Sequence, residues 1–301
     1  VASGAITNGK PVIVHTDGTV KQVAETAIAQ QLGSDVLFNS SDETSYMTNI
    51  YDSNSNKVVT LYLNQDGSND GTARVGTVDT SDNSISYGTA AEYTTNFGFF
   101  TSGTFDSDTN KVVTVYRDGG DSNKGKAVVG TVSGTDISFG SIATFYSGVV
   151  GHYTTTTYDT NSDKVVVAYV DGSNSNRGMA IVGDVSGTSI GFGSAATFET
   201  GSTSWIASTF DSNSNKVVIS YRDDNNSYYG TAIVGTVSGD SISFGTAVVY
   251  NSATTEKQGA TFDSNSNKVV LFYQDQGNSN RGTAIVGTIS GTSISFGTAV
   301  V

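Results

Sequence analysis

A nine-residue motif that occurs five times constrains the fold of this chain more than any other feature. Its last copy reads Phe-Asp-Ser-Asn-Ser-Asn-Lys-Val-Val, and successive copies begin 54, 53, 52 and 52 residues apart. Self-similarity at such a fixed period indicates a repeat architecture, because one unit of this size cannot bury its apolar face alone. The copies occupy residues 51–59, 105–113, 158–166, 210–218 and 262–270.

Each repeat is expected to hold four strands, which the fourth repeat shows most plainly. Runs rich in β-branched and aromatic residues cover 205–210, 216–222, 230–237 and 241–250, with turn-forming residues between them. Four short strands in every unit are typical of β-propeller blades. The sequence therefore predicts an all-β fold, a five-bladed β-propeller of four-stranded antiparallel blades. Two alternatives stay open: six blades, with residues 10–38 as a partial blade, and a solenoid.

The opening residues do not carry the motif. Two short apolar runs flank Asp17-Gly18, which is a strong hairpin signal. Residues 32–38 align with 244–250, the last strand of a later repeat. We therefore expect two parts: an N-terminal β-hairpin or attachment segment at 1–33, and a repeat β-propeller at 34–301. The hairpin is expected to contact neighbouring protein subunits by edge-strand pairing.

Composition restricts the classes of partner. The net charge is −13 and the pI is about 4.3, which argues against nucleic acid, because such partners require a basic surface. The absence of Cys excludes disulfides and thiolate metal sites. No apolar run approaches membrane length, so membrane insertion is not expected.

The repeated Asp-x-Asn-x-Asn spacing matches the first half of a calcium loop. Position 6, normally Gly, is Lys in all five copies, and no acid stands at position 12, where the residues are Leu63, Arg117, Val170, Arg222 and Gln274. We interpret the Asp residues as caps of tight turns and predict no metal and no cofactor.

Catalytic signatures are weak. An acid or amide follows a Tyr by two residues in every repeat, at Asn64, Asp118, Asp171, Asp223 and Asp275. Five-bladed glycosidases use carboxylates near the axis, but a catalytic pair needs unlike environments, whereas these positions are equivalent. His15 and His152 lie in no triad or zinc spacing. We predict no catalytic residues and a protein that is not an enzyme.

One repeat position differs among the copies. Five residues before the Phe or Tyr of the motif stand Tyr46, Phe100, Tyr153, Trp205 and Lys257. The predicted strand order puts this position on the same rim as the variable loops that join the second and third strands. Two interpretations stay open: packing between blades, and a stacking surface for sugars or another partner. We take these five residues as the candidate binding site.

The stretch Thr-Ala-Ile-Val-Gly-Thr-Val-Ser-Gly-x-Ser-Ile-Ser-Phe-Gly-Thr-Ala-Val-Val at 231–249, with a near copy at 283–301, resembles repeat proteins of marine bacteriophages. The resemblance covers residues 34–301. The opening residues 4–14 and 17–20 are also similar to short β modules of phage head and tail proteins. This resemblance implies a virion-surface or adhesive role, without catalytic residues.

Three functions follow from these observations, in decreasing order. The first is a non-enzymatic structural or adhesive module, located extracellularly or on a virion surface. The second is a multivalent carbohydrate-binding lectin, for which the acidic net charge favours neutral glycans. A glycosidase comes last.

Overall fold

The computed structural model describes residues 12–14, 16, 19–22, 33, 35–40, 43–65 and 69–301. The chain separates into two compact units, one formed by residues 1–35 with 80–84 and the other by residues 36–79 with 85–301. The fold is all-β, as predicted. Apart from the short 3-10 helix η1 (Gln276–Asn278), every element in the described residues is a strand. Within this part of the chain, no helix has the length and apolar character needed to cross a bilayer.

In the described residues of the first unit, two strands form a hairpin. Strands β1 (Val12–Val14) and β2 (Val20–Gln22) pair antiparallel, with Val14 opposite Val20. Asp17-Gly18 and His15, together with most of the predicted attachment segment, lie outside the described residues. The proposed pairing of this segment with a neighbouring subunit stays a prediction.

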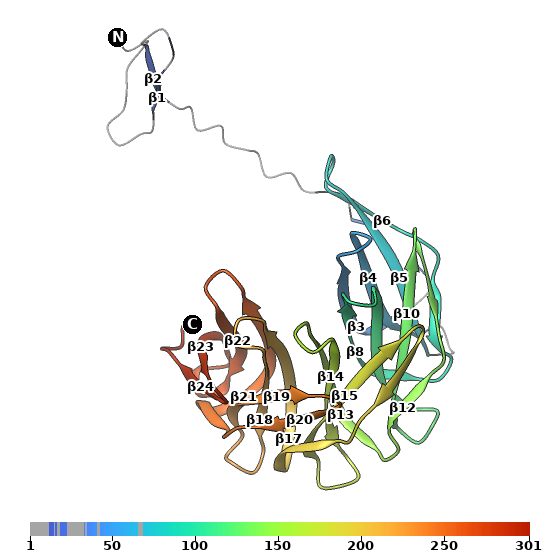
Figure 1. Ribbon diagram of the computed structural model, residues 1–301, viewed down its shortest axis with the longest axis vertical. Coiled ribbons are helices and arrows are strands. Elements are labelled where there is room, and N and C mark those ends of the chain that lie inside the picture. The colour runs from blue at the N-terminus through green and yellow to red at the C-terminus, as the bar shows by residue number, and fades with distance from the viewer. Residues whose placement is uncertain are drawn as a thin grey trace. The chain divides into compact units, whose positions relative to one another are not determined.

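The second unit consists of five consecutive repeats, each of which contributes four antiparallel strands (Figure 1). The first repeat has β3 (Thr44–Asp52), β4 (Lys57–Asn64), β5 (Asp70–Asp79) and β6 (Ser84–Tyr87). The second has β8 (Gly98–Asp106), β9 (Lys111–Asp118), β10 (Lys124–Ser133) and β11 (Asp136–Phe139). The third has β13 (Val150–Asp159), β14 (Lys164–Asp171), β15 (Arg177–Ser186) and β16 (Ser189–Phe192). The fourth has β17 (Ala196–Asp211), β18 (Lys216–Asp223), β19 (Tyr229–Ser238) and β20 (Ser241–Phe244). The fifth has β21 (Val248–Asp263), β22 (Lys268–Asp275), β23 (Arg281–Ser290) and β24 (Ser293–Phe296).

The predicted fourth strand at 241–250 is two strands rather than one. Its first half is β20, and its second half is the start of β21; both pair with β19. The strands β7 (Ala91–Thr94) and β12 (Ala143–Tyr146) are the second halves in earlier repeats. The break occurs at Gly245, where an added Cβ would lie 1.9 Å from the Thr292 carbonyl oxygen. The chain therefore bends where the next repeat's turn is seated against it.

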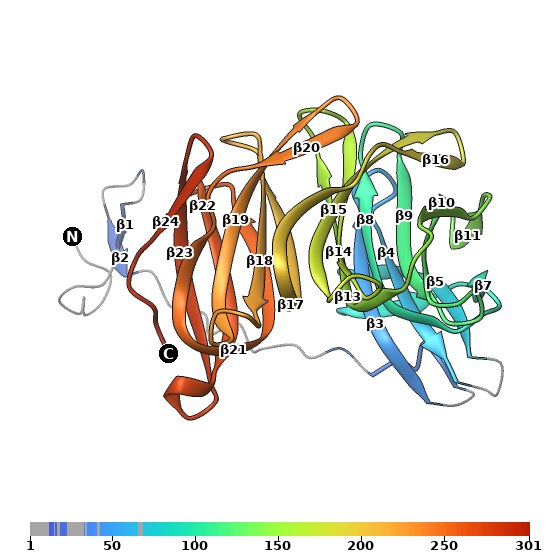
Figure 2. The same ribbon diagram turned by 90° about the horizontal axis from the view of Figure 1, so that it is seen from below.

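The apolar core lies between consecutive repeats, which stand side by side in chain order (Figure 2). Val218 and Val234 of the fourth repeat pack with Val269 and Leu271 of the fifth, all nearly inaccessible to solvent. The second strands of the first four repeats are thus covered on both faces, which explains their runs of Val residues, whereas Phe272 of β22 in the fifth repeat is 52% exposed. Full burial of one such side chain contributes about 1.5–3 kcal/mol.

Aromatic side chains join each repeat to the next. Phe198 lies at the start of β17, in the part that pairs with β15 of the third repeat, and its ring centroid is 5.2 Å from that of Tyr221 and 5.9 Å from that of Phe244, both in the fourth repeat. Phe38 makes the same two contacts with Tyr62 and Tyr87 of the first repeat. At Phe38 the packing therefore agrees with the alignment of residues 32–38 with 244–250. Residues 35–38 are nevertheless not a strand, because among the described residues no third strand of a preceding repeat lies beside them.

The Phe or Tyr that opens each motif copy is predicted by the repeat pattern to be buried between repeats, and the structure shows a less uniform burial. Tyr158 is buried, while Phe105, Phe210 and Phe262 are half-buried against the cores between repeats. Tyr51 is 58% exposed, so the expectation of burial is wrong there. No earlier motif strand among the described residues covers the first repeat, and Tyr51 donates to Asn56 Oδ1 at 2.8 Å.

The first strands of neighbouring repeats approach one another closely. Ser102 and Thr156 hydroxyls lie 2.8 Å apart, and those of Thr155 and Ser208 are 3.0 Å apart. Small side chains on these first strands permit the contacts. This arrangement places the residues just before them, at the same end of each first strand, in register across the repeats.

Candidate functional site

The variable position of the first strand is a β-bulge in every repeat. The strand register shifts between Ser204 and Ala207 of the fourth repeat, and the other repeats shift at the equivalent place. All five residues at the bulge have left-handed backbone conformations, with φ of 51° for Trp205 and Lys257 and 85° for Tyr153. Such values are unfavourable for residues other than Gly, Asn and Asp.

The bulge brings four of the five predicted binding residues into one row. The ring centroids are 4.8 Å apart for Tyr46 and Phe100, 6.0 Å for Phe100 and Tyr153, and 4.7 Å for Tyr153 and Trp205. Tyr46 is 38% exposed, whereas Phe100, Tyr153 and Trp205 are half-buried. The rings therefore pack between repeats and also keep part of their surface accessible. Lys257 continues the series at an exposed position.

A cavity of about 470 Å³ opens beside this row. Its lining comes from three repeats, with Arg117 from the second, His152 and Tyr153 from the third, and Thr203, Ser204, Arg222 and Asp224 from the fourth. His152 stacks on Phe100 with ring centroids 5.0 Å apart. Burial raises the pKa of Tyr153, while the nearby Arg222 charge works in the opposite direction. The cavity thus combines aromatic surface with charged groups.

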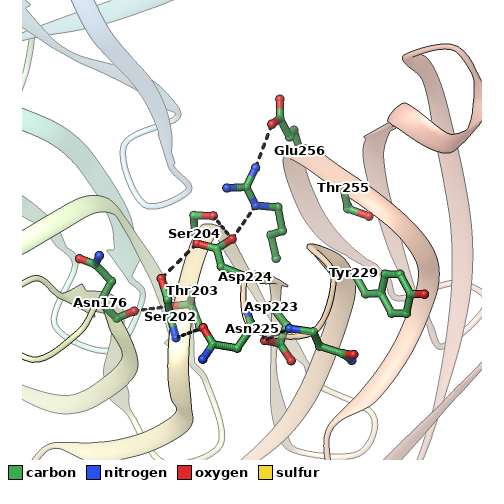
Figure 3. Close-up of polar contacts among 12 residues, drawn as sticks. Asn176, Ser202, Thr203, Ser204, Asp223, Asp224, Asn225, Tyr229, Thr255 and Glu256 are labelled. Atoms are coloured by element: carbon green, nitrogen blue, oxygen red, sulfur yellow. Dashed lines mark hydrogen bonds and ion pairs between the residues drawn. The ribbon is translucent and has the colours of Figure 1, made fainter.

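Arg222 is held by two carboxylates on one side of the cavity. Its Nε donates to Asp224 Oδ1 at 2.7 Å, and its Nη1 donates to Glu256 Oε1 at 2.8 Å. Ser204 and Ser202 donate to the two Asp224 oxygens at 2.9 and 3.2 Å (Figure 3). The guanidinium also lies 5.1 Å from the Tyr228 ring centroid. This network fixes the positions of its polar groups, as binding sites for small molecules require.

Arg117 occupies the same repeat position as Arg222 but has different surroundings. Its Nε donates to Asn123 Oδ1 at 2.8 Å, and its guanidinium lies 5.8 Å from the Phe100 ring centroid and 6.0 Å from that of Phe99. Across the described residues it forms no ion pair with a carboxylate. Desolvation by burial lowers the pKa of Arg117. The side chain is half-buried and borders the cavity.

The acids at the ends of the second strands serve the loops that follow. Asp118 accepts from the Gly120 and Asp121 amides at 3.0 Å, and Asp223 accepts from those of Asn225 and Asn226 at 3.1 Å. Asp171 and Asp275 likewise accept backbone N–H groups. These bonds give the acids a structural role in the loops that follow the second strands. Burial, and then the Glu199 charge, raise the pKa of Asp223.

The Asp residues of the repeated motif also cap their own turns. Asp106 Oδ1 accepts from the Asp108 and Thr109 amides at 3.0 and 3.1 Å, and its Oδ2 accepts from Thr109 Oγ1 at 2.7 Å. The amides of the other four turns are bound in the same way. Within the described ranges, no cluster of three His, Asp or Glu side chains is placed to hold a metal ion.

Sequence reasoning found the aromatic row but missed most of the cavity. Tyr153 is the predicted residue that lines it, and Trp205 and Phe100 contact that residue. Arg117, His152, Arg222 and Asp224 were not predicted as site residues. A signal was available at position 12 of the calcium-loop numbering, the twelfth residue counted from the motif Asp, where the copies differ and two of them carry Arg. The spacing between motif copies does not predict that three repeats contribute residues to one cavity.

Solved structures similar to this chain include lectins. A triple arginine-to-alanine mutant of AofleA from Arthrobotrys oligospora has a TM-score of 0.53 at 13% identity, covering 85% of this chain and 74% of that chain. The SapL1 lectin in complex with alpha methyl fucoside has a TM-score of 0.53 at 12% identity, covering 85% and 80%. A mutant of the Aleuria aurantia lectin AAL in complex with Fucalpha1-6GlcNAc has a TM-score of 0.50 at 14% identity, covering 84% and 77%. No protein-family profile and no curated protein matches the chain.

These likenesses support a β-propeller repeat fold. Two of these structures are named as lectins, and nothing in any of the three supports a marine bacteriophage origin, so that resemblance is left without support. The structural or adhesive role that stands first among the functions expected from the sequence finds no support in these structures.

Proposed function

We propose that this protein is a carbohydrate-binding lectin and that its principal sugar site is the cavity between Arg117 and Arg222. The observation that carries the proposal is the meeting, in one cavity, of stacked aromatic rings and a fixed polar network. Sugar rings have apolar faces that stack on aromatic side chains, and hydroxyls that pair with charged groups. The fucose-containing ligands of two neighbouring structures support the same ligand class.

The proposal includes five blades and a non-enzymatic role. In this interpretation each repeat is one blade, and the site lies where three consecutive blades meet. The carboxylates at the cavity are engaged: Asp224 accepts from Arg222 and two serines, and Glu256 accepts from Arg222. The paired environments of a glycosidase, one acid protonated and one ionised, are not built from these two groups. An extracellular or virion-surface location stays a prediction.

The chain carries its own reporter for a binding test. Trp205 is the single Trp of the sequence, and its ring lies 4.7 Å from Tyr153, which lines the cavity. Titration with methyl α-fucoside, followed by Trp fluorescence and by calorimetry, is expected to show saturable binding. A glycan array then ranks other sugars. If no sugar on the array binds and the titration shows no saturable signal, the proposed function is contradicted.

The matched variants are Tyr153→Ala and Tyr51→Ala. Loss of the Tyr153 ring is expected to weaken binding by about 1–3 kcal/mol, as for one aromatic anchor. Tyr51 is 58% exposed, does not line the cavity, and controls for the loss of a Tyr in general. Thermal melts of both variants separate lost affinity from lost folding. Equal affinities in the two variants would show that the sugar binds elsewhere.

A further inference from the structure

We propose that the cavity selects acidic sugars, with a ligand carboxylate paired to the guanidinium of Arg117. This inference rests on the proposed function, because it names the ligand class of the same site. The observation behind it is that two arginines at the same repeat position, both bordering this cavity, have different interaction partners. Arg222 is paired with two carboxylates, and Arg117 with none in the described part of the chain.

The charges around the cavity are unevenly distributed. At one end, Arg222, Asp224 and Glu256 are joined by ion pairs and sum to one negative charge. At the other end, the partners of Arg117 are neutral, namely Asn123 and the rings of Phe99 and Phe100. A ligand with an anionic group and several hydroxyls matches this polarity. Its carboxylate would lie at Arg117, and its hydroxyls at Ser204, Asp224 and Thr203.

Arg117 is also oriented for a planar anion. Asn123 accepts from Nε, which leaves the two terminal nitrogens of the guanidinium without an assigned acceptor among the described residues. The rings of Phe99 and Phe100 lie beside the guanidinium, with centroids 6.0 and 5.8 Å from its central carbon. Two parallel N–H groups are the geometry that arginine uses for bidentate binding of carboxylates. We therefore favour a carboxylate over a sulfate ester.

The acidic net charge of the chain does not oppose this selection at physiological salt. Charges on the surface are screened beyond about 8 Å, whereas direct pairing at a half-buried guanidinium is screened much less. The proposal thus departs from the neutral glycans that the net charge of −13 favours. It also gives the desolvated Arg117 charge, whose pKa is lowered by burial, the counter-ion that its surroundings lack.

The test compares sugars that differ only at one carbon. The methyl glycosides of galactose and galacturonate, and those of glucose and glucuronate, are titrated into the full chain, with methyl α-fucoside as the neutral reference. The acidic member of at least one pair is expected to bind about tenfold tighter or more, as one charge-assisted bidentate contact would give. Equal affinity within both pairs, alongside measurable fucoside binding, would overturn this inference and leave the proposed function standing. If none of the five glycosides binds and no sugar on the glycan array binds, both this inference and the proposed function are overturned.

Two variants assign the preference to Arg117. Arg117→Gln is expected to abolish the difference in affinity between the acidic and the neutral member of each pair, and Arg117→Lys, which keeps the charge but not the paired donors, to retain part of that difference. Arg281→Gln is the matched control, because it removes one exposed positive charge that does not line this cavity. A preference that survives in Arg117→Gln would overturn the assignment. So would tighter binding of 6-sulfogalactose than of galacturonate by the unmodified chain.

Discussion

Two regions of every repeat place a residue in the left-handed conformation, and they fill that position in opposite ways. In the turn after the first strand it is always Asn or Asp, at Asn56, Asn110, Asp163, Asn215 and Asn267. In the first-strand bulge it is Tyr, Phe, Tyr, Trp and Lys. Asn and Asp adopt this conformation readily, whereas aromatic residues do so at a cost of roughly 1–2 kcal/mol. The turn is built for folding, and the bulge retains residues that its backbone does not favour.

This contrast separates scaffold from site. Outliers in backbone conformation concentrate at functional positions, where the surrounding structure holds them in place. The turns repeat the same Asp cap in five copies, while the bulges and the following loops differ from copy to copy. We therefore expect changes on the turn side to alter stability alone, and changes on the bulge side to alter binding.

The largest expected effect tests the scaffold side at Gly245. Gly245→Ala should lower the free energy of unfolding by about 3 kcal/mol, because the new Cβ would meet the Thr292 carbonyl 1.9 Å away and force the repeats apart. Gly191→Ala is the control, since no atom lies within 4 Å of its added Cβ. Urea denaturation measures both. Similar midpoints for the two variants would mean that the repeats are not seated against one another at this bend.

The next effect distinguishes the two acids of one turn. Asp106→Ala should destabilise the chain by about 1–2 kcal/mol, because it leaves two amides and the Thr109 hydroxyl without their acceptor. Asp108→Ala, at an exposed position in the same turn, should be nearly neutral. Unfolding is measured with and without a calcium chelator. Equal losses in both variants, together with an effect of the chelator, would restore the calcium interpretation.

The sequence predicted the scaffold better than the site, for a physical reason. Each repeat contains its own strand and turn signals, so the five four-stranded units and the Asp caps follow from local patterns. The break at Gly245 depends on the Thr292 carbonyl of the next repeat, and the cavity depends on Arg117, His152 and Arg222 from three repeats. Contacts of this kind arise from packing between units, and no period within one unit encodes them.

A smaller effect is expected at the bulge of the fifth repeat, where Lys257 stands in place of an aromatic residue. Lys257→Gly should raise the free energy of unfolding by about 0.5–1 kcal/mol, because Gly adopts the φ of 51° without strain, although it also loses more entropy on folding. Lys268→Gly, at the first residue of β22 in the same repeat, should instead destabilise by a similar amount. Thermal melts compare the two. Destabilisation by Lys257→Gly would show that the bulge carries little strain.

The smallest effect concerns the exposed turn of the fifth repeat in acid. Hydrogen bonds from the Ser266 hydroxyl and from the Asn265 and Ser266 amides lower the pKa of Asp263. A lowered pKa in the folded state means that the cap contributes stability above the unfolded pKa of about 3.9, and that this contribution is lost as pH falls through the folded value. The Asn265 and Ser266 amides should therefore lose protection from hydrogen exchange below about pH 4, relative to the intrinsic rate. In Asp263→Asn the same amides should show no such pH dependence, because the group no longer titrates. Protection that persists at pH 2 in the unmodified chain would place the ordering of this turn in its backbone rather than in the Asp263 cap.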